Sequence, residues 1–281
     1  MNAYADLTTL KSASYLNLSV TTHDTYLTRL LDTASRQVDE FCRRNFYCSE
    51  GTRVYDGAES IVFFPDDILS ITTFKMDEDC DGTYETSLTA DTDYVLCPYN
   101  KYPKTWAELS SSGSSKISGF NDGVKKGLQV IGVFGYGDES SRGASPYLAS
   151  GAIVNTGGIT AAAMTHALAT GKGALFSVGM TIRIDSEQLY VSGVSTDTLT
   201  FEHGVNGTTS AAHSAAAVIY IYQYPYAVYQ STLILAMRAW KRKDSAYQDV
   251  VGLGEMGTVI ASKGFDADAA RLLMPYVRVN Q

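Results

Sequence analysis

The feature that most constrains this chain is an interruption of its pattern at residues 147–222. The sequence before it, residues 1–146, reads as a compact domain that lacks its last helix, and an apolar helix follows only at residues 225–243. The stretch between them is rich in Gly, Ala, Ser and Thr, holds few charges and reads as short strands. A domain inserted into another domain accounts for this order better than two domains in succession. We therefore predict a discontinuous host domain, residues 1–146 and 223–281, and an inserted domain, residues 147–222.

The host is expected to be mostly α-helical. Its clearest helix spans about residues 23–45, where apolar residues recur every three or four positions and form one stripe. Asp24 is the expected N-cap of this helix, because its carboxylate can accept a hydrogen bond from a free backbone N–H of the first turn. A short helix is expected within residues 6–18 and a last one over residues 266–273.

Short strands fill the host between its two long helices. Residues 68–76 and 127–135 are the clearest, and the second is dense in β-branched residues. The dipeptide Asp56-Gly57 predicts a hairpin turn between strands at 52–55 and 60–64.

The insert is expected to be an all-β domain, either a small barrel or a sandwich. Residues 179–184, 188–194 and 198–202 read as strands with short turns between them, residues 218–222 make another, and residues 174–176 are a candidate partner strand. The predicted fold class is therefore α+β, a mostly α-helical host with short strands, interrupted by an all-β insertion.

Composition excludes several functions. The formal net charge of −8 argues against general coating of nucleic acid, which needs a basic surface, although an acidic wall would let enclosed DNA slide. No run of about 18 apolar residues is present, so no membrane span is expected. The first residues lack the basic and apolar regions of a secretory signal, so synthesis in the cytoplasm is expected.

No catalytic constellation stands out. The histidines His23, His166, His203 and His213 form neither an HxxxH nor an HxH pair, and the four cysteines show no metal-binding spacing. Neither a GxSxG motif nor a phosphate-binding P-loop is present. We therefore predict a protein that is not an enzyme and holds no cofactor.

One acidic motif has calcium-loop spacing. The sequence DEDCDG from residue 77 matches the start of such a loop, because hard cations prefer several carboxylate oxygens on a tight turn. However, Leu88 occupies the twelfth position, where a bidentate Glu is expected. We favour an acidic hairpin tip and predict no metal site, with calcium as the alternative. The candidate ligands would be Asp77, Asp79, Asp81 and Glu85.

Charged residues gather on both long helices and can be read in two ways. The mixed charges of the first helix are either a solvated face or a contact between subunits. The cations that end the second helix either complement its dipole or face DNA or an acidic partner. These cations are Arg238, Lys241, Arg242 and Lys243.

Several host motifs, taken in order, resemble the head–tail connector (adaptor) proteins of tailed bacteriophages. The resemblance covers roughly residues 1–146 and 223–281, and the order and spacing of the motifs carry it more than any motif alone. The motifs run as a start from Asp6 to Leu16, the segment Leu30 to Ser35, the pattern Val38-x-x-Phe41-x-x-Arg44-x-Phe46, a strand from Thr52 to Tyr55, a strand from Val130 to Tyr136, a helix from Leu235 to Arg242, and a tail from Pro275 to Arg278. The insert departs from simple adaptors and instead resembles β modules of other phage structural proteins, in the segments Gly179 to Glu187 and Gly204 to Thr208.

This resemblance implies a structural virion protein of the phage neck, at the head–tail interface. It implies a homo-oligomeric ring of about twelve subunits that joins the portal protein to the next neck, stopper or tail protein. The ring would enclose DNA without sequence-specific binding and would contact no membrane. The alternative function is a calcium- or carbohydrate-binding surface module of a virion.

The resemblance also assigns roles to residues. Expected subunit contacts are Arg29, Arg36, Glu40 and Arg43 on the first long helix, and Tyr229, Leu233, Ile234 and Met237 on the second. Expected contacts with the DNA channel or a partner are Arg238, Lys241, Arg242 and Lys243. Expected portal-docking residues, within 256–281, are Leu273, Pro275, Tyr276 and Arg278.

Overall fold

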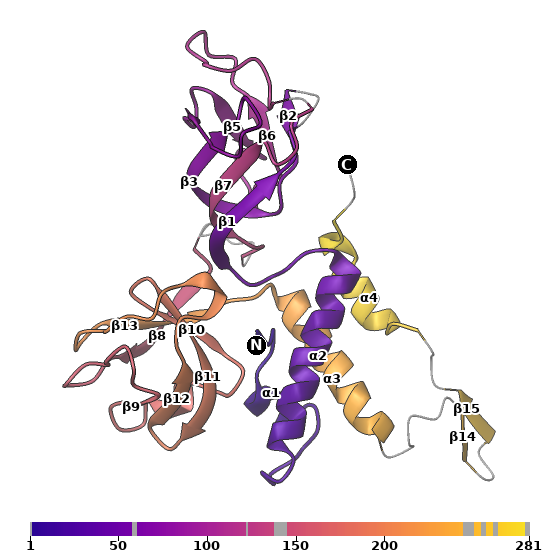
Figure 1. Ribbon diagram of the computed structural model, residues 1–281. Coiled ribbons are helices and arrows are strands. Elements are labelled where there is room, and N and C mark those ends of the chain that lie inside the picture. Colours follow the sequence, from indigo (N-terminus) through magenta and orange to yellow (C-terminus); the bar gives the residue numbers. More distant parts are fainter. Residues whose placement is uncertain are drawn as a thin grey trace. The chain divides into compact units, whose positions relative to one another are not determined.

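A computed structural model describes residues 2–57, 61–121, 123–137, 145–243, 250–253, 257–260 and 264–278 (Figure 1). The chain divides into two compact units. Unit 1 comprises residues 1–43, 147–205 and 209–278, and unit 2 comprises residues 44–146, 206–208 and 279–281. The domain boundaries at 147 and 222 stay a prediction, although the first and last strands of one sheet begin at Tyr147 and end at Tyr222.

The prediction of a mostly α-helical host is wrong, because the fold is mostly β. In the described residues, three antiparallel sheets contain 13 strands, and the chain has only four α-helices. The helical periodicity predicts the two long helices correctly, but these helices lie only near the ends of the host. The host strands between the long helices do not pack on the outside of a helical core. They form two sheets of their own, with a separate apolar core in unit 2.

The α-helices all lie in unit 1. They are α1 (Leu7–Lys11), α2 (Asp24–Cys42), α3 (Tyr226–Lys243) and α4 (Ala267–Leu273). Asp6 caps α1 by accepting a hydrogen bond from Thr9 N at 2.9 Å. The predicted capping role of Asp24 is wrong, since His23 is the N-cap of α2 and makes no side-chain capping bond. Asp24 is instead the first helical residue, and its carboxylate pairs with Lys11.

Helix α2 ends earlier than predicted because Arg43 adopts a left-handed conformation, with φ at 55°. Its buried stripe matches the predicted apolar periodicity. Figure 1 shows α2 and α3 side by side, and α4 packs against α3. Near the C-terminal end of α2, Phe41 stacks on Phe265 with ring centroids 4.5 Å apart. The buried residues of the stripe are Leu27, Leu31, Ala34, Ser35, Val38 and Cys42.

The six-stranded sheet of unit 1 is antiparallel, with the strand order β8-β13-β10-β11-β12-β9. Alternate residues of its central strands face one apolar core, which includes Ile182, Leu189, Leu199 and Ile219. Its strands are β8 (Tyr147–Ile153), β9 (Thr165–Ala167), β10 (Thr181–Ile184), β11 (Glu187–Ser195), β12 (Thr198–Glu202) and β13 (Val218–Tyr222).

One edge of this sheet is bulged. Strand β8 pairs with β13 so that Ile219 faces Ala152 while Tyr220 faces Ala149, which leaves Ser150 and Gly151 without partners in the register. Gly151 has φ at 80°, a conformation that suits glycine. The bulge therefore kinks β8 along the outer edge of the sheet.

The predicted strand at residues 174–176 is wrong. The chain there forms a 3-10 helix, η1 (Gly173–Leu175). The carboxylate of Asp197 accepts hydrogen bonds from Gly171 N at 3.0 Å and Gly173 N at 2.8 Å. These bonds use backbone donors that a sheet partner would need.

Unit 2 contains two antiparallel sheets, with strand orders β1-β7-β3-β4 and β2-β6-β5. Aromatic residues dominate its core, where Phe74 lies against Phe120 and Tyr94. The strands are β1 (Ser49–Tyr55), β2 (Val62–Phe63), β3 (Ile68–Met76), β4 (Thr86–Leu88), β5 (Tyr94–Cys97), β6 (Trp106–Leu109) and β7 (Leu128–Phe134).

The predicted hairpin at Asp56-Gly57 is wrong, since β1 pairs with β7 and β2 pairs with β6. Gly57 instead passes against another segment. A Cβ atom at Gly57 would lie 1.7 Å from the backbone oxygen of Asn121, and Gly57 N donates to Val124 O at 2.8 Å. The glycine is therefore needed for a close approach rather than for a turn.

The remaining elements are short. Strands β14 (Val250–Leu253) and β15 (Gly257–Ile260) pair with each other, and 3-10 turns lie at η2 (Val205–Gly207) and η4 (Met274–Tyr276). Across the described part of the chain, no helix is long and apolar enough to cross a membrane.

Candidate functional site

The residues of α2 that were predicted to contact another subunit differ in exposure. Arg29, Glu40 and Arg43 are exposed. Arg36 is half-buried, because its guanidinium pairs with Asp39 at 2.9 Å and donates to the backbone oxygen of Asn2 at 2.9 Å. Arg36 therefore holds the N-terminal segment against α2, whereas the other three present mixed charges on the surface.

Of the four predicted contact residues of α3, one is buried and three are half-buried. Leu233 is fully buried and packs within unit 1. Tyr229 is half-buried, and its hydroxyl donates to Asp6 at 2.7 Å. Ile234 and Met237 are half-buried, so each keeps part of its apolar side chain on the surface.

The cationic end of α3 is largely engaged within the chain. Arg238 forms an ion pair with Asp266, the residue that caps α4. The ammonium of Lys243 lies 3.8 Å from the centre of the Trp240 ring. Lys241 is exposed and Arg242 is half-buried. Lys241 is thus the most accessible of the four predicted channel-facing cations.

The predicted portal-docking residues surround η4. Leu273 is fully buried, Pro275 is exposed, and Tyr276 and Arg278 are half-buried. The backbone N–H of Arg278 donates to Cys42 O at 2.8 Å, which ties this segment to the end of α2. The rest of the predicted docking segment lies partly outside the described residues.

The acidic loop, residues 77–85, brings its four carboxylates together. One oxygen from each of the candidate ligands lies within 4.8 Å of the others. Asp77 is buried, and its carboxylate accepts from Cys80 N at 2.8 Å and Gly82 N at 2.9 Å. The members are Asp77, Asp79, Asp81 and Glu85.

The twelfth position of this loop cannot supply a ligand. Leu88 belongs to β4 and packs in the apolar core of unit 2. A cation would therefore rely on the four carboxylates and on backbone oxygens, with no bidentate glutamate. The positive φ of Gly82, at 89°, provides the tight turn that the motif requires.

A carboxylate–histidine cluster, which was not predicted from the sequence, lies at the six-stranded sheet. It comprises Asp185, Glu187, His203 and His213. Glu187 is fully buried and lies 2.7 Å from His203 Nδ1 and 2.8 Å from His213 Nε2. The other nitrogen of His213 lies 2.8 Å from Asp185, and His203 Nε2 lies 2.6 Å from the backbone oxygen of Ala163.

Each ring nitrogen of His203 and of His213 lies within hydrogen-bond distance of an oxygen atom. Burial alone raises the pKa of the Glu187 carboxyl, but the hydrogen bonds it accepts from Ala211 N, His203, Gly204 N and His213 outweigh burial and hold its pKa below the ordinary value. No local spacing announces the cluster, because its members lie on separate strands and loops. The one available signal was an acidic residue inside an otherwise apolar strand pattern.

A scan against protein-family models and a search of curated proteins found no match to this sequence. The resemblance to head–tail adaptors therefore rests on the sequence motifs.

Proposed function

We propose that this protein is a head–tail adaptor of the phage neck. It would form a closed ring that joins the portal protein to the next neck or tail protein around the DNA channel, without catalysis. The observation that carries this proposal is the order of host motifs, which resembles that of adaptor proteins from Asp6 to Arg278. The fold class predicted from the sequence patterns does not hold, so the proposal rests on the motifs and on the helices.

The helices are consistent with assembly. The exposed charges of α2 have both signs, so the same surface can pair with a different surface on the next subunit, as a closed ring requires. The net charge of −8 fits a channel through which DNA slides rather than one that grips it. The backbone bond between Arg278 and Cys42 fixes one end of the proposed docking segment beside α2.

Electron microscopy and mass photometry of the purified chain test this proposal. We expect rings with a central channel that co-purify with the portal protein of the same phage. Reversing the charge of Arg29 and Glu40 together, as Arg29→Glu with Glu40→Lys, should abolish rings, because like charges placed in a contact cost several kcal/mol. Lys101→Glu, an exposed position in unit 2, is the matched control and should leave rings intact. A chain that stays monomeric and does not bind the portal protein contradicts the proposal.

A second candidate function is calcium binding by the acidic loop, which the convergence of its four carboxylates favours. Titration calorimetry with CaCl₂ should then show binding that the double substitution Asp79→Asn with Asp81→Asn weakens by about tenfold or more, since affinity follows the number of charged ligands. Asp91→Asn removes an exposed carboxylate elsewhere in unit 2 and should change nothing. Absence of heat, with no change in melting temperature, removes this candidate.

A further inference from the structure

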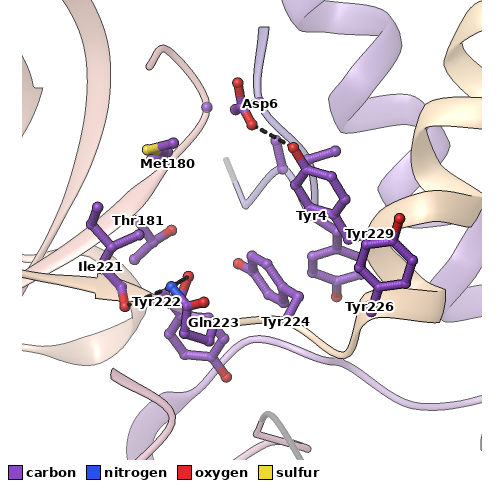
Figure 2. Close-up of a pocket in the computed structure, with 13 residues that line it drawn as sticks. Tyr4, Asp6, Met180, Thr181, Ile221, Tyr222, Gln223, Tyr224, Tyr226 and Tyr229 are labelled. Atoms are coloured by element: carbon purple, nitrogen blue, oxygen red, sulfur yellow. Dashed lines mark hydrogen bonds between the residues drawn. The ribbon is translucent and has the colours of Figure 1, made fainter. Parts of the chain in front are cut away.

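A tyrosine-rich pocket of about 460 Å³ opens in unit 1 (Figure 2). One side is formed by the start of β10 and the end of β13, and the other by residues 3–6 and the first turns of α3. This volume lies within the range of roughly 300–1,000 Å³ typical of small-molecule sites. We call it the tyrosine pocket. Its aromatic residues are Tyr4, Tyr222, Tyr224, Tyr226 and Tyr229.

The walls of the pocket are fixed by contacts between its two sides. Leu7 N donates to Val178 O at 3.0 Å, and Thr8 N donates to the Ser177 hydroxyl at 3.0 Å. These bonds attach the N-terminal segment to the loop before β10. The pocket is therefore preformed, which lowers the entropic cost of binding.

Aromatic rings line the pocket from its floor to its rim. Tyr224 packs between Tyr4 and Tyr222, with ring centroids 4.7 Å and 4.6 Å away. Tyr226 is 78% exposed, which is unusual for so large a side chain, and it stands at the rim. Its ring is thus free to cover a ligand that enters.

The lining carries no charge that is available to a ligand. Asp6 is the only carboxylate among the described lining residues, and it is buried. Its oxygens already accept hydrogen bonds from Thr9 N, from the Thr9 hydroxyl and from Tyr229. Burial, reinforced by nearby carboxylates, raises the pKa of Tyr4 and of Tyr229, so both phenols stay neutral. Each phenol already donates to a carboxylate, Tyr4 to Asp39 and Tyr229 to Asp6. The lining therefore has no positive charge that could bind an anion. Its one carboxylate is already hydrogen-bonded and so is not available to bind a cation.

One polar group in the pocket lacks a partner. Thr181 is 1% exposed, and among the described residues none forms a hydrogen bond with its Oγ1 atom. Figure 2 shows Thr181 on the sheet side of the pocket, facing Tyr224 and Tyr4. Buried hydroxyls are almost always hydrogen-bonded, so this one indicates a ligand that supplies the missing partner. A purely apolar ligand would leave it unsatisfied.

We propose that the tyrosine pocket binds a neutral sugar of one or two pyranose rings. The apolar C–H face of a pyranose stacks on Tyr226, and one of its hydroxyls pairs with the Thr181 hydroxyl. This chemistry matches the aromatic walls, the unpartnered Thr181 hydroxyl and the uncharged lining together. The inference goes beyond the proposed adaptor function and does not depend on ring formation.

Saturation-transfer NMR and calorimetry on the full chain test the proposal with four neutral probes, namely maltose, cellobiose, lactose and N,N′-diacetylchitobiose. We expect at least one to bind and glucose 6-phosphate not to bind. Thr181→Val keeps the shape but removes the hydroxyl, so binding should weaken about five- to tenfold. The melting temperature of this variant should stay unchanged or rise, because the lost hydroxyl has no partner in the protein. A fall in melting temperature would assign Thr181 a structural role and overturn the proposal.

Tyr226→Ala should weaken sugar binding about tenfold or more, since it removes the exposed ring. Tyr99→Ala is the matched control, because Tyr99 is 66% exposed and belongs to unit 2. The proposal is overturned if none of the four neutral probes binds at millimolar concentration. It is also overturned if decaproline binds in a way that depends on Tyr226, because the ligand would then be an extended peptide. Ring formation, measured on the same samples by mass photometry, is expected to be unchanged by Tyr226→Ala, so the two proposals fail separately.

Discussion

Glu187 shows how one buried carboxylate organises a segment of the chain. It is the shared acceptor for two histidines and for the backbone N–H groups of Gly204 and Ala211. Buried charges are tolerated when every lone pair has a donor, and that condition is met here. Replacing any member of the cluster would therefore leave a buried polar group without a hydrogen-bond partner.

Replacing Glu187 by Gln should lower the free energy of unfolding by about 3 kcal/mol, because the amide would direct its own donors at donors. Urea denaturation at neutral pH measures this loss. The matched control is Glu202→Gln, an exposed position on β12, which should change stability by less than about 0.5 kcal/mol. Equal effects from the two substitutions would contradict the role assigned to the cluster.

The pH dependence follows from the direction of the pKa shift of Glu187. Its pKa in the folded protein is below the ordinary value of 4.5, so its contribution to stability is present above that value. The contribution is lost as the pH falls through the lower, folded-state pKa. The difference in stability between wild type and Glu187→Gln should therefore narrow in acid, and a difference that grows in acid would refute the assignment.

At the scale of elements, α2 ends at Arg43, whose backbone adopts an unfavourable conformation for a residue other than glycine. Arg43 is exposed and holds φ at 55°, in the left-handed region that favours glycine. An arginine at such a position suggests a use for its side chain, and Arg43 is one of the residues expected to contact another subunit. Stability and assembly should therefore respond in opposite directions when it is replaced.

Arg43→Gly should raise the free energy of unfolding by about 1 kcal/mol, since glycine adopts this conformation without strain. The same substitution inside the helix, in its second turn, Arg29→Gly, should lower the free energy of unfolding by about 1 kcal/mol. Thermal and urea unfolding of both variants measure the two signs. Destabilisation by Arg43→Gly would mean that the side chain holds the helix end through contacts of its own.

Local signals in the sequence predicted single elements well. The prediction of α3 over 225–243 is confirmed to within one residue, and that of β3 over residues 68–76 is confirmed at both ends. Pairing between strands was not predictable, because Asp56-Gly57 carries a hairpin signal while the close approach to Asn121 decides the path. The acidic loop was found because its residues are contiguous, whereas the carboxylate–histidine cluster and the tyrosine pocket join distant segments.

At the scale of the whole molecule, the fold class was predicted wrongly because the two long helices have the clearest periodicity in the sequence. They nevertheless make up only a small share of the chain. The residues between them are divided among short strands whose patterns are individually weak, yet together they build three sheets and two apolar cores. Sequence periodicity identifies a long amphipathic helix more readily than several short strands. The resemblance to adaptors includes motifs of the same two helices and does not depend on the fold class. Electron microscopy of rings therefore tests the proposed function separately from the fold class.

The bulge in β8 has a consequence for how the protein behaves among its own copies. An outer strand with a straight row of free N–H and C=O groups invites a strand from a neighbouring molecule, and that reaction propagates into aggregates. The side chains of Leu148 and Ile153 on β8 are about half exposed, which would add to the attraction. Gly151 and Ser150 break the straight row at its middle, so an incoming strand could match only one half of β8 at a time.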